Sequence, residues 1–235
     1  MLALLVAMSS CHARAQSTRP QADMTTPNVL SAEESAQGFR LLFDGTSTRG
    51  WRGYRNPVMP AGWAAVDGAL TRVSQTSDII TIDEFENFEL RLSWKIPPGG
   101  NSGIMYHVTE EGDAPYTSGP EMQVLDDSGH ADGRNRLTSA GSDYGLYAAP
   151  AGIVHRAGEW NDIRIIVRGP HVEHWMNGVK VVEYELWSNE WKAKVEASKF
   201  HQWPEYGLAH RGHIALQGDH DGAVQYRAIR IKVLP

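Results

Sequence analysis

Hydrophobic and polar residues alternate with a period of two over most of the chain from residue 38 onward. The alternation is clearest in residues 88–96, where Phe, Leu, Leu, Trp and Ile take turns with Glu, Arg, Ser and Lys. Residues 160–168 and 224–234 show the same pattern. It predicts antiparallel strands with one face in the core and the other in solvent.

Glycine-containing turns separate these runs. The Asp-Gly at residues 67–68 and the Asn-Gly at residues 177–178 are typical of two-residue hairpin turns, in which both residues have positive φ. Only residues 189–197 have a pattern that predicts a helix, of about two turns. Neither an internal repeat nor β-α-β alternation is present. We therefore expect one all-β domain over residues 38–235, either a sandwich of two antiparallel sheets or a barrel.

The alternation continues in residues 171–185, which predict a further hairpin. There we expect Trp175 and Val182 in the core, and Glu173 and His174 in solvent. We assign this hairpin no chemistry.

The N-terminus resembles an export signal. Residues 1–15 begin with a short apolar run and end in Ala-Arg-Ala, which fits the small-x-small pattern of a signal peptidase site. Cys11 is the only cysteine, so we expect no internal disulfide. In a lipoprotein-like box Cys11 would carry a lipid anchor; otherwise it is removed with the signal, and both alternatives imply export to the periplasm or the exterior. Residues 16–37 are rich in Pro, Thr, Ser and Gln and predict a flexible tether.

The composition limits the classes of binding partner that are expected. The 235 residues carry 28 acidic and 22 basic side chains, a net charge of −6 and no basic stripe, so nucleic acid is not an expected partner. No apolar run reaches the ~20 residues that a transmembrane helix needs. Eight Trp residues are many for one domain, and their flat rings suit either a core or a surface on which sugars stack.

One predicted strand carries an unusual polar face. In residues 121–125, Glu121 and Gln123 point to one side, while Met122 and Val124 point to the other. A carboxylate beside an amide would suit a catalytic or sugar-binding pair. An ordinary solvated strand face is the alternative, and the spacing alone does not separate the two.

Two histidines and a glutamine are further candidates. His107 lies in a strand that follows the glycine-rich residues 99–103, and histidine titrates near neutrality, which suits acid–base chemistry. A hydrogen-bonded structural histidine is the simpler explanation for it. Gln217 ends a later strand and is followed by a turn that contains His220. Histidine is not among the residues that turns favour, so the turn itself does not explain its presence.

Several kinds of site are excluded by their missing motifs. Despite ten His, the chain has no His-Glu-x-x-His, paired-cysteine or EF-hand spacing. It also has no phosphate loop, dinucleotide fingerprint or Gly-x-Ser-x-Gly elbow. We therefore expect neither a metal site nor a cofactor, although a structural Ca²⁺ stays open.

A series of sequence blocks occurs in a characteristic order. The blocks are GFRLLFDGTSTRGW, GGNSGIMYHV, GPEMQVLDD, YGLYAAP, GEWNDIRIIVRGPHVEHWMNGVKVVEYE, SKF and GHIALQGDHDGAVQYRAIRIKVL. Together they resemble the 3-keto-disaccharide hydrolase family over residues 38–234. The resemblance implies an exported protein with a concanavalin A-like lectin/glucanase fold, a jelly-roll sandwich of two antiparallel sheets. It also implies hydrolysis of glycosides that already carry a ketone at C3 of the sugar, with a small carbohydrate as the substrate.

The resemblance also points to individual residues. These are Glu121, Gln123, Asn101, Ser102, Gln217 and His220. Asp126, at the end of the Glu121 strand, is a further substrate-binding candidate. The chain departs from the family twice, because Arg is common where this chain has His107, and the turn at residues 218–222 is one residue longer. Both departures leave the assignment of acid and base open.

The chemistry of a 3-keto sugar suits this set. Ordinary glycosidases need two carboxylates, roughly 5 Å apart in retaining and roughly 6.5–9.5 Å apart in inverting enzymes. On the strand of Glu121 the next position on the same face is an amide, Gln123. A ketone at C3 acidifies the C2 proton, so one base, donors to the enolate oxygen and one acid suffice. We expect Glu121 as the base, Gln123 and Gln217 as donors, and His107 or His220 as the acid.

Two other functions stay open. Folding could bring a second carboxylate to Glu121, from Asp126, Asp143 or Asp219, and produce a conventional glycoside hydrolase. The same architecture also serves lectins, so a non-catalytic carbohydrate-binding module is the third possibility. The aglycone, the linkage and the oligomeric state do not follow from the sequence.

Overall fold

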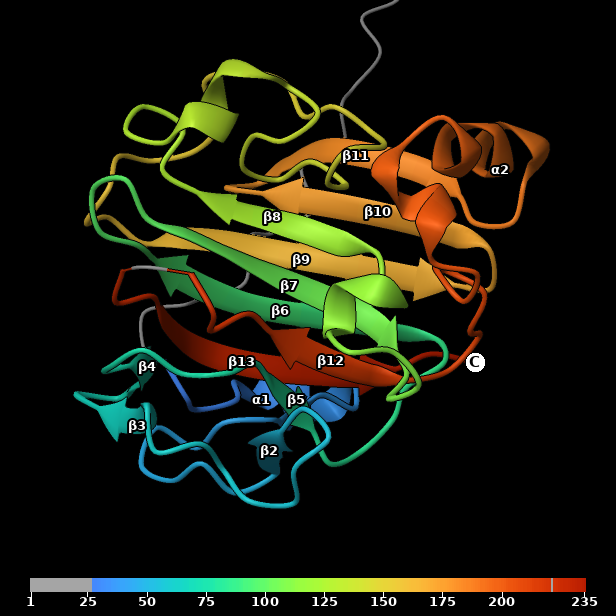
Figure 1. Cartoon of the computed structure of the whole chain (residues 1–235). Helices are drawn as coiled ribbons and strands as arrows, with labels where there is room; N and C mark the ends of the chain where they lie inside the picture. Colours follow the sequence, from blue (N-terminus) through green and yellow to red (C-terminus); the bar gives the residue numbers. More distant parts are fainter. Residues whose placement is uncertain (1–26, 221) are drawn as a thin grey trace, which may run out of the picture.

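The computed structural model describes residues 27–220 and 222–235. Within them, two antiparallel sheets pack face to face, with short helices at their edges (Figure 1). The predicted fold class, a sandwich of two antiparallel sheets, is confirmed. The helix expected at residues 189–197 is present as α2 (Asn189–Glu196), with Ser188 as its N-cap. Over the part of the chain that the structure describes, no helix combines the length and the apolar character needed to cross a membrane.

We call the larger sheet, which lies behind in Figure 1, the back sheet. Its strand order is β11-β10-β9-β6-β13-β4-β3, and β1 pairs with β13. The strands are β1 (Arg40–Leu41), β3 (Trp63–Val66), β4 (Ala69–Arg72), β6 (Phe88–Lys95), β9 (Asn161–Arg168), β10 (His171–Met176), β11 (Val179–Glu185) and β13 (Gln225–Val233).

The smaller sheet, called the front sheet, has the order β2-β5-β12-β7-β8. Its strands are β2 (Trp51–Gly53), β5 (Ile79–Thr81), β12 (His213–Leu216), β7 (Asn101–Val108) and β8 (Glu121–Leu125). Three 3₁₀ helices lie in its connections, namely η1 (Pro115–Thr117), η2 (Ala131–Arg134) and η3 (Lys199–Gln202).

β6 illustrates how the alternating pattern builds the core. Phe88, Leu90, Leu92 and Trp94 are each at most 1% exposed and belong to one apolar cluster with residues of β7 and β8. The polar residues between them face outward, apart from Ser93, which is buried. Burying one such large apolar side chain contributes roughly 1.5–3 kcal/mol. The hydrophobic positions of β6 therefore hold the two sheets together.

Both predicted two-residue turns are present. Asp67 and Gly68 have φ angles of 50° and 75°, and Asn177 and Gly178 have φ angles of 49° and 81°. These values are those of turns in which both central residues are left-handed. The turns close the β3–β4 and β10–β11 hairpins.

Residues 27–37 are folded, so the tether predicted for them is wrong. They contain α1 (Ala32–Ala36), which begins with a reciprocal capping box between Ser31 and Glu34. Glu34 Oε2 also accepts a hydrogen bond of 2.7 Å from Nη1 of Arg230, a side chain with no exposed surface. The Ser-x-x-Glu spacing is the sequence signal that predicts such a helix start, and the domain thus begins before residue 38.

The remaining N-terminal predictions lie outside the described residues. They are the signal peptide at residues 1–15, the lipid anchor at Cys11 and the first part of the tether, residues 16–26. They stay predictions.

On β10 the side chains point to the faces opposite to those expected from the sequence. His174 is fully buried, and its Nε2 lies 3.0 Å from the hydroxyl of Tyr106. Trp175 is only partly buried, because its ring faces outward under the guanidinium of Arg164, 4.2 Å from the ring centroid. The expectation for this strand is wrong for both residues, whereas Val182 is in the core as predicted. A large aromatic side chain can be covered by a cation as well as by a core.

Candidate active site

Glu121 and Gln123 lie on the outer face of the front sheet. On β8, Glu121 pairs with Met105 of β7, and Gln123 pairs with Gly103. Gln217 directly follows β12, and its N–H donates to the carbonyl oxygen of Gly103 over 3.0 Å. Directly paired residues project to the same face of a sheet. Glu121, Gln123 and Gln217 therefore share one face, and Gly103 lies between the two glutamines.

The missing side chain of Gly103 makes room for the Glu121 carboxylate. A Cβ atom added to Gly103 would overlap Oε1 of Glu121 and crowd its carboxyl carbon. The carboxylate therefore lies over the β7 backbone. Gly103 does not have a positive φ angle, so this close approach, and not the backbone conformation, requires the glycine.

Burial determines the acidity of Glu121, which is 7% exposed. It adjoins an apolar cluster that comprises Ile80, Met105, Val108 and Ala215. Burial raises the pKa of Glu121 to about 8; the Lys199 ammonium opposes this rise, and neighbouring carboxylates, first Asp78, add to it. No hydrogen bond from the described residues holds this carboxylate in its charged form. Such a raised pKa in an unpaired group marks a candidate for proton transfer.

Amide groups with unused hydrogen-bonding capacity share the sheet face of the carboxylate. Oε1 of Gln123 accepts the N–H of Val124 over 3.2 Å, which leaves its NH₂ group to point elsewhere. Oε1 of Gln217 and Oδ1 of Asn101 are buried without a partner among the described residues. Asn101 lies two residues before Gly103 and projects to the same face. An unsatisfied buried polar atom costs roughly 1–3 kcal/mol, so these atoms would gain from the hydroxyl groups of a bound sugar.

Asp78 is a carboxylate of this face that the sequence reasoning misses. Leu216 pairs with Ile79, so the next pair along the strands places Asp78 beside Gln217. Oδ1 of Asp78 accepts the N–H of Gly218 over 2.7 Å, and burial raises the pKa of Asp78 to about 6. In the sequence it precedes two Ile residues and has the appearance of an ordinary strand start. No sequence signal marks it.

Lys199 supplies a positive charge near Glu121. It is the first residue of η3, and its Nζ lies 4.4 Å from the ring centroid of Tyr144. Tyr144 donates its N–H to the carbonyl oxygen of Glu121 over 2.9 Å, and its hydroxyl donates to Oδ2 of Asp132 over 3.3 Å. Lys199 belongs to the short block SKF, which is its only sequence signal.

His107 does not share the face of Glu121, so the expectation that it could act as the acid beside Glu121 is wrong. Between two consecutive register pairs β7 has one more residue than β12, which is a β-bulge, and His107 has a φ of 53° within it. Its Nε2–H donates to the carbonyl oxygen of Glu86 over 2.8 Å, and its ring contacts the core rings of Phe88 and Tyr106 edge-on. Burial lowers the pKa of His107. The candidate role of His107 as the acid has no geometric support.

Ser102 and Asp126 also have structural partners. The hydroxyl of Ser102 is buried, donates to the carbonyl oxygen of Gln217 over 2.8 Å and lies 2.7 Å from the hydroxyl of Tyr226. Ser102 therefore faces the core, and its expected place at a substrate site is wrong. The carboxylate of Asp126 accepts the N–H of Gly99 over 2.8 Å and further donors of its own turn. It holds the turn after β8.

His220 lies in the turn that follows Gln217. Its side chain is 44% exposed, and its Nε2 lies 3.8 Å from Oδ1 of Asp219. Asp219 adds to the rise in the pKa of Glu121, whereas Asp143 bridges Met122 beside β8 and, like Met122, has its side chain fully buried on the core side of the sheet. Burial raises the pKa of Asp143 well above its ordinary value. Asp143 therefore cannot serve as a second carboxylate on the face of Glu121.

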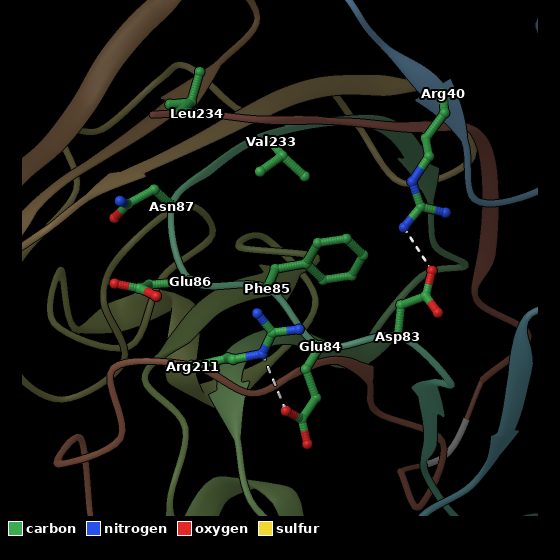
Figure 2. Close-up of a pocket in the computed structure, with 9 residues that line it drawn as sticks. All are labelled: Arg40, Asp83, Glu84, Phe85, Glu86, Asn87, Arg211, Val233 and Leu234. Atoms are coloured by element: carbon green, nitrogen blue, oxygen red, sulfur yellow. Dashed lines mark hydrogen bonds and ion pairs between the residues drawn. The ribbon is translucent and has the colours of Figure 1, made fainter.

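A pocket of about 420 Å³ lies elsewhere, beside the C-terminal end of β13 (Figure 2). Two of its three carboxylates are paired with cations, Asp83 with Arg40 over 2.6 Å and Glu84 with Arg211 over 3.3 Å, and the third, Glu86, is exposed. None of the site residues predicted from the sequence lines it. Because the carboxylates of this pocket are all exposed, whereas Glu121 is buried and has no hydrogen-bonding partner among the described residues, we assign the chemistry to the face of Glu121.

Comparisons with known proteins give consistent matches. Residues 38–232 match the 3-keto-alpha-glucoside-1,2-lyase-like domain. A Bacteroides thetaiotaomicron protein described as a 3-keto-disaccharide hydrolase is 36% identical over 237 residues, which cover 87% of this chain and 81% of that protein. Two crystal structures from Parabacteroides distasonis, both described as candidate glycosyl hydrolases, are also similar. One has a TM-score of 0.84 at 33% identity and covers 89% of this chain and 100% of its own; the other has a TM-score of 0.65 at 28% identity, with 83% and 99% covered.

Proposed function

The chain belongs to the 3-keto-alpha-glucoside-1,2-lyase-like family, and we propose that it hydrolyses 3-keto-glycosides by removal of the C2 proton, elimination and hydration. The observation that carries this proposal is the Glu121 carboxylate, which is buried without a hydrogen-bonding partner among the described residues, so that burial raises its pKa to about 8. A general base is most effective when its pKa lies near the working pH. The curated relative described as a 3-keto-disaccharide hydrolase supports the substrate class.

The reaction needs one base because the ketone supplies the acidity. Glu121 takes the C2 proton, and the electrons of the C–H bond form the C2=C3 enolate. The enolate then re-forms the ketone, a C1=C2 double bond forms, and the C1–O bond to the leaving group breaks. Water adds to C1 and a proton returns to C2, so the sum is one glycoside and one water giving 3-keto-sugar and free alcohol.

Gln123 is the group that would stabilise the enolate oxygen, because its NH₂ group lies on the same face as the base. The Lys199 ammonium acts on the base itself, since it opposes the rise in the pKa of Glu121. A donor aimed at developing negative charge is worth roughly 2.7–4 kcal/mol in comparable sites. Gln217 and Asn101 would bind sugar hydroxyls through their unpartnered oxygens.

The leaving oxygen also needs a proton. Glu121 holds one after the first step, and C1 is the ring neighbour of C2, so the same carboxyl can deliver it. His220 is the remaining histidine candidate, in the turn that follows Gln217. The proposal therefore does not depend on His107.

A conventional glycoside hydrolase is the second candidate, because Asp78 is a buried carboxylate on the same face. The charge of Asp78 adds to the rise in the pKa of Glu121, although β12 and β7 lie between the strands of the two residues. However, one Asp78 oxygen is held by the N–H of Gly218 over 2.7 Å, which favours a structural part for it. The two candidates differ in their substrates, since only the elimination requires the C3 ketone.

We also propose that the protein is exported, on the basis of the signal-like residues 1–15. A lipid anchor would require Cys11 to become the first residue of the mature chain. The mass of the N-terminal peptide of the mature protein, purified from its native host, decides between acylated Cys11 and cleavage after residue 15.

The proposed activity is tested by comparing an oxidised sugar with the same sugar before oxidation. The purified protein is incubated with 3-keto-trehalose or a 3-keto-glucoside, and with the same sugar before oxidation. We expect release of the leaving group from the oxidised sugar only. Equal rates on both sugars would favour the conventional hydrolase, and binding without turnover would favour a carbohydrate-binding module.

A further inference from the structure

Two aromatic side chains border the face of Glu121 on one side. Tyr116 belongs to η1, and Trp203 directly follows η3; their rings meet edge to face with centroids 5.4 Å apart. Both are only partly buried. Tyr116 packs against the apolar cluster that contains Met105, the cross-strand partner of Glu121. Tyr116 thus lies beside the cross-strand neighbour of the base, and Trp203 contacts Tyr116.

The two 3₁₀ helices that carry this pair are held to one another and to Glu121. The N–H of Gly207 donates to the carbonyl oxygen of Ser118 over 2.7 Å, which joins the segment after η3 to the segment after η1. Figure 1 shows the orange η3 segment beside the green η1 segment, where β8 starts. The same η3 begins with Lys199, whose charge reaches Glu121. One short element therefore places a cation and an aromatic ring at the site.

The face of Glu121 is consequently divided into two halves. Toward the C-terminal end of β8 it is polar, with Gln123, Gln217 and Asn101. Toward the N-terminal end of β8 it is apolar and aromatic, with Tyr116 and Trp203. Glu121 lies at the boundary.

The connectivity of a sugar ring determines how a substrate uses the two halves, if the proposed function holds. C1 and C3 are the two ring neighbours of C2, so they lie on opposite sides of the proton that Glu121 removes. The C3 ketone needs hydrogen-bond donors and therefore belongs in the polar half. C1 and its leaving group must then point toward the aromatic half.

We propose that Tyr116 and Trp203 form the leaving-group subsite, and that the protein acts on 3-keto-glycosides whose leaving group is a ring with a flat face, as a second sugar or an aryl group is. A flat ring stacks on exposed aromatic side chains, which a small alkyl group cannot do. The proposal rests on the proposed function and adds the class of leaving group to it.

The experiment compares phenyl and methyl 3-keto-glucoside as substrates of three Trp203 forms. Trp203→Leu removes the flat face and keeps apolar bulk, whereas Trp203→Phe keeps a ring. For the phenyl substrate we expect Trp203→Leu to lower kcat/KM by roughly 3–10-fold, mainly through KM, and Trp203→Phe to restore most of it. For the methyl substrate both variants should stay within about 2-fold of the parent. Tyr116→Leu should behave as Trp203→Leu does.

Trp160→Leu is the matched control, since Trp160 lies between Lys95 and Arg227 on the outer face of the back sheet. It should leave both substrates unchanged, and melting temperatures show that each variant is folded. Equal losses on phenyl and methyl substrates, or no loss on either, would overturn the subsite while the proposed function stands. A parent protein inactive on both 3-keto substrates would overturn the proposed function and the subsite together.

Discussion

The two sheets present polar outer faces that differ in how their charges are satisfied. On the back sheet Glu89 pairs with Arg91 over 2.6 Å, and Lys180 pairs with Glu183 over 2.6 Å. On the front sheet the carboxylate of Glu121 has no hydrogen-bonding partner among the described residues, although it is only 7% exposed. Both faces show the same alternation of polar and apolar residues in the sequence.

This difference distinguishes an ordinary solvated sheet face from the face of a candidate active site. Paired charges at a surface add little stability. An unpaired buried carboxylate is costly to ionise. Such groups with a shifted pKa are found mainly at functional sites, where they transfer protons. The oxygens of Gln217 and Asn101, unpartnered in the described structure, belong to the same front face. We expect substitutions on the front face to change activity, and those on the back face to change only stability.

Glu121→Gln should have the largest effect. It removes the base but keeps the shape, so turnover of a 3-keto-glucoside should fall by roughly 10²–10⁴-fold. The stability of the variant should increase although its turnover falls. The folded chain keeps the Glu121 proton up to a pKa of about 8, whereas an unfolded carboxyl releases it near 4.5. The stability of the parent therefore declines as the pH rises from 4.5 to 8, and the variant should melt at a higher temperature than the parent at pH 8.

Glu89→Gln on the back sheet is the control, because its carboxylate is held by Arg91. It should leave turnover within about 2-fold of the parent. Full activity of Glu121→Gln in a correctly folded variant would reject Glu121 as the base.

Gly103→Ala should have the next largest effect. The new methyl group would displace the Glu121 carboxylate from its place over β7, and a shift of about 1 Å can cost roughly 10²-fold in rate. Gly53→Ala is the matched control in β2, where the new atom would lie 3.0 Å from Cβ of Asn56 and far in sequence from Glu121. Steady-state kinetics on one 3-keto-glucoside measure both variants. Unchanged kinetics of Gly103→Ala would contradict the carboxylate position described above.

Lys199→Met should shift the pH dependence. Lys199 opposes the rise in the pKa of Glu121, so its removal should move that pKa above 8. A base acts when deprotonated, so kcat/KM rises with pH through its pKa. The midpoint should move to higher pH by up to ~1 unit, with a loss of up to ~10-fold at pH 7. Lys180→Met on the back sheet should not move the midpoint, and an unmoved midpoint for Lys199→Met would remove Lys199 from the site.

Glu183→Gln should have the smallest effect. Its partner Lys180 is 34% exposed and Glu183 itself is 47% exposed. Such a pair is worth about 0.2–1 kcal/mol, so a urea unfolding curve should shift slightly while turnover stays the same. A clear loss of turnover would show that the back face also takes part in function.

Alternation along the chain was sufficient for the fold but not for every side chain. The Phe88 to Trp94 positions, the two-residue turns and α2 follow from local patterns and are present as expected. The bulge in β7 inserts one residue and turns His107 from the expected face toward the core. Alternation contains no sign of such an insertion, because the bulge depends on pairing with β12.

Long-range contacts explain the other differences. Residues 27–37 look like a tether until Glu34 meets Arg230, which lies near the other end of the chain. Asp78 joins the site only because β5 pairs with β12. Glu121, Gln123 and Gln217, in contrast, could be grouped in advance because their strands are regular where they meet.

The central claim, that the C2 proton is removed, is tested most directly by carrying out the reaction in D₂O. Elimination followed by hydration returns a solvent proton to C2. We therefore expect the 3-keto-glucose released in the first turnovers to carry one deuterium at C2, measured by NMR and mass spectrometry. The same sugar incubated in D₂O without protein for the same time corrects for spontaneous exchange. Product released at full rate without deuterium at C2 would contradict the account.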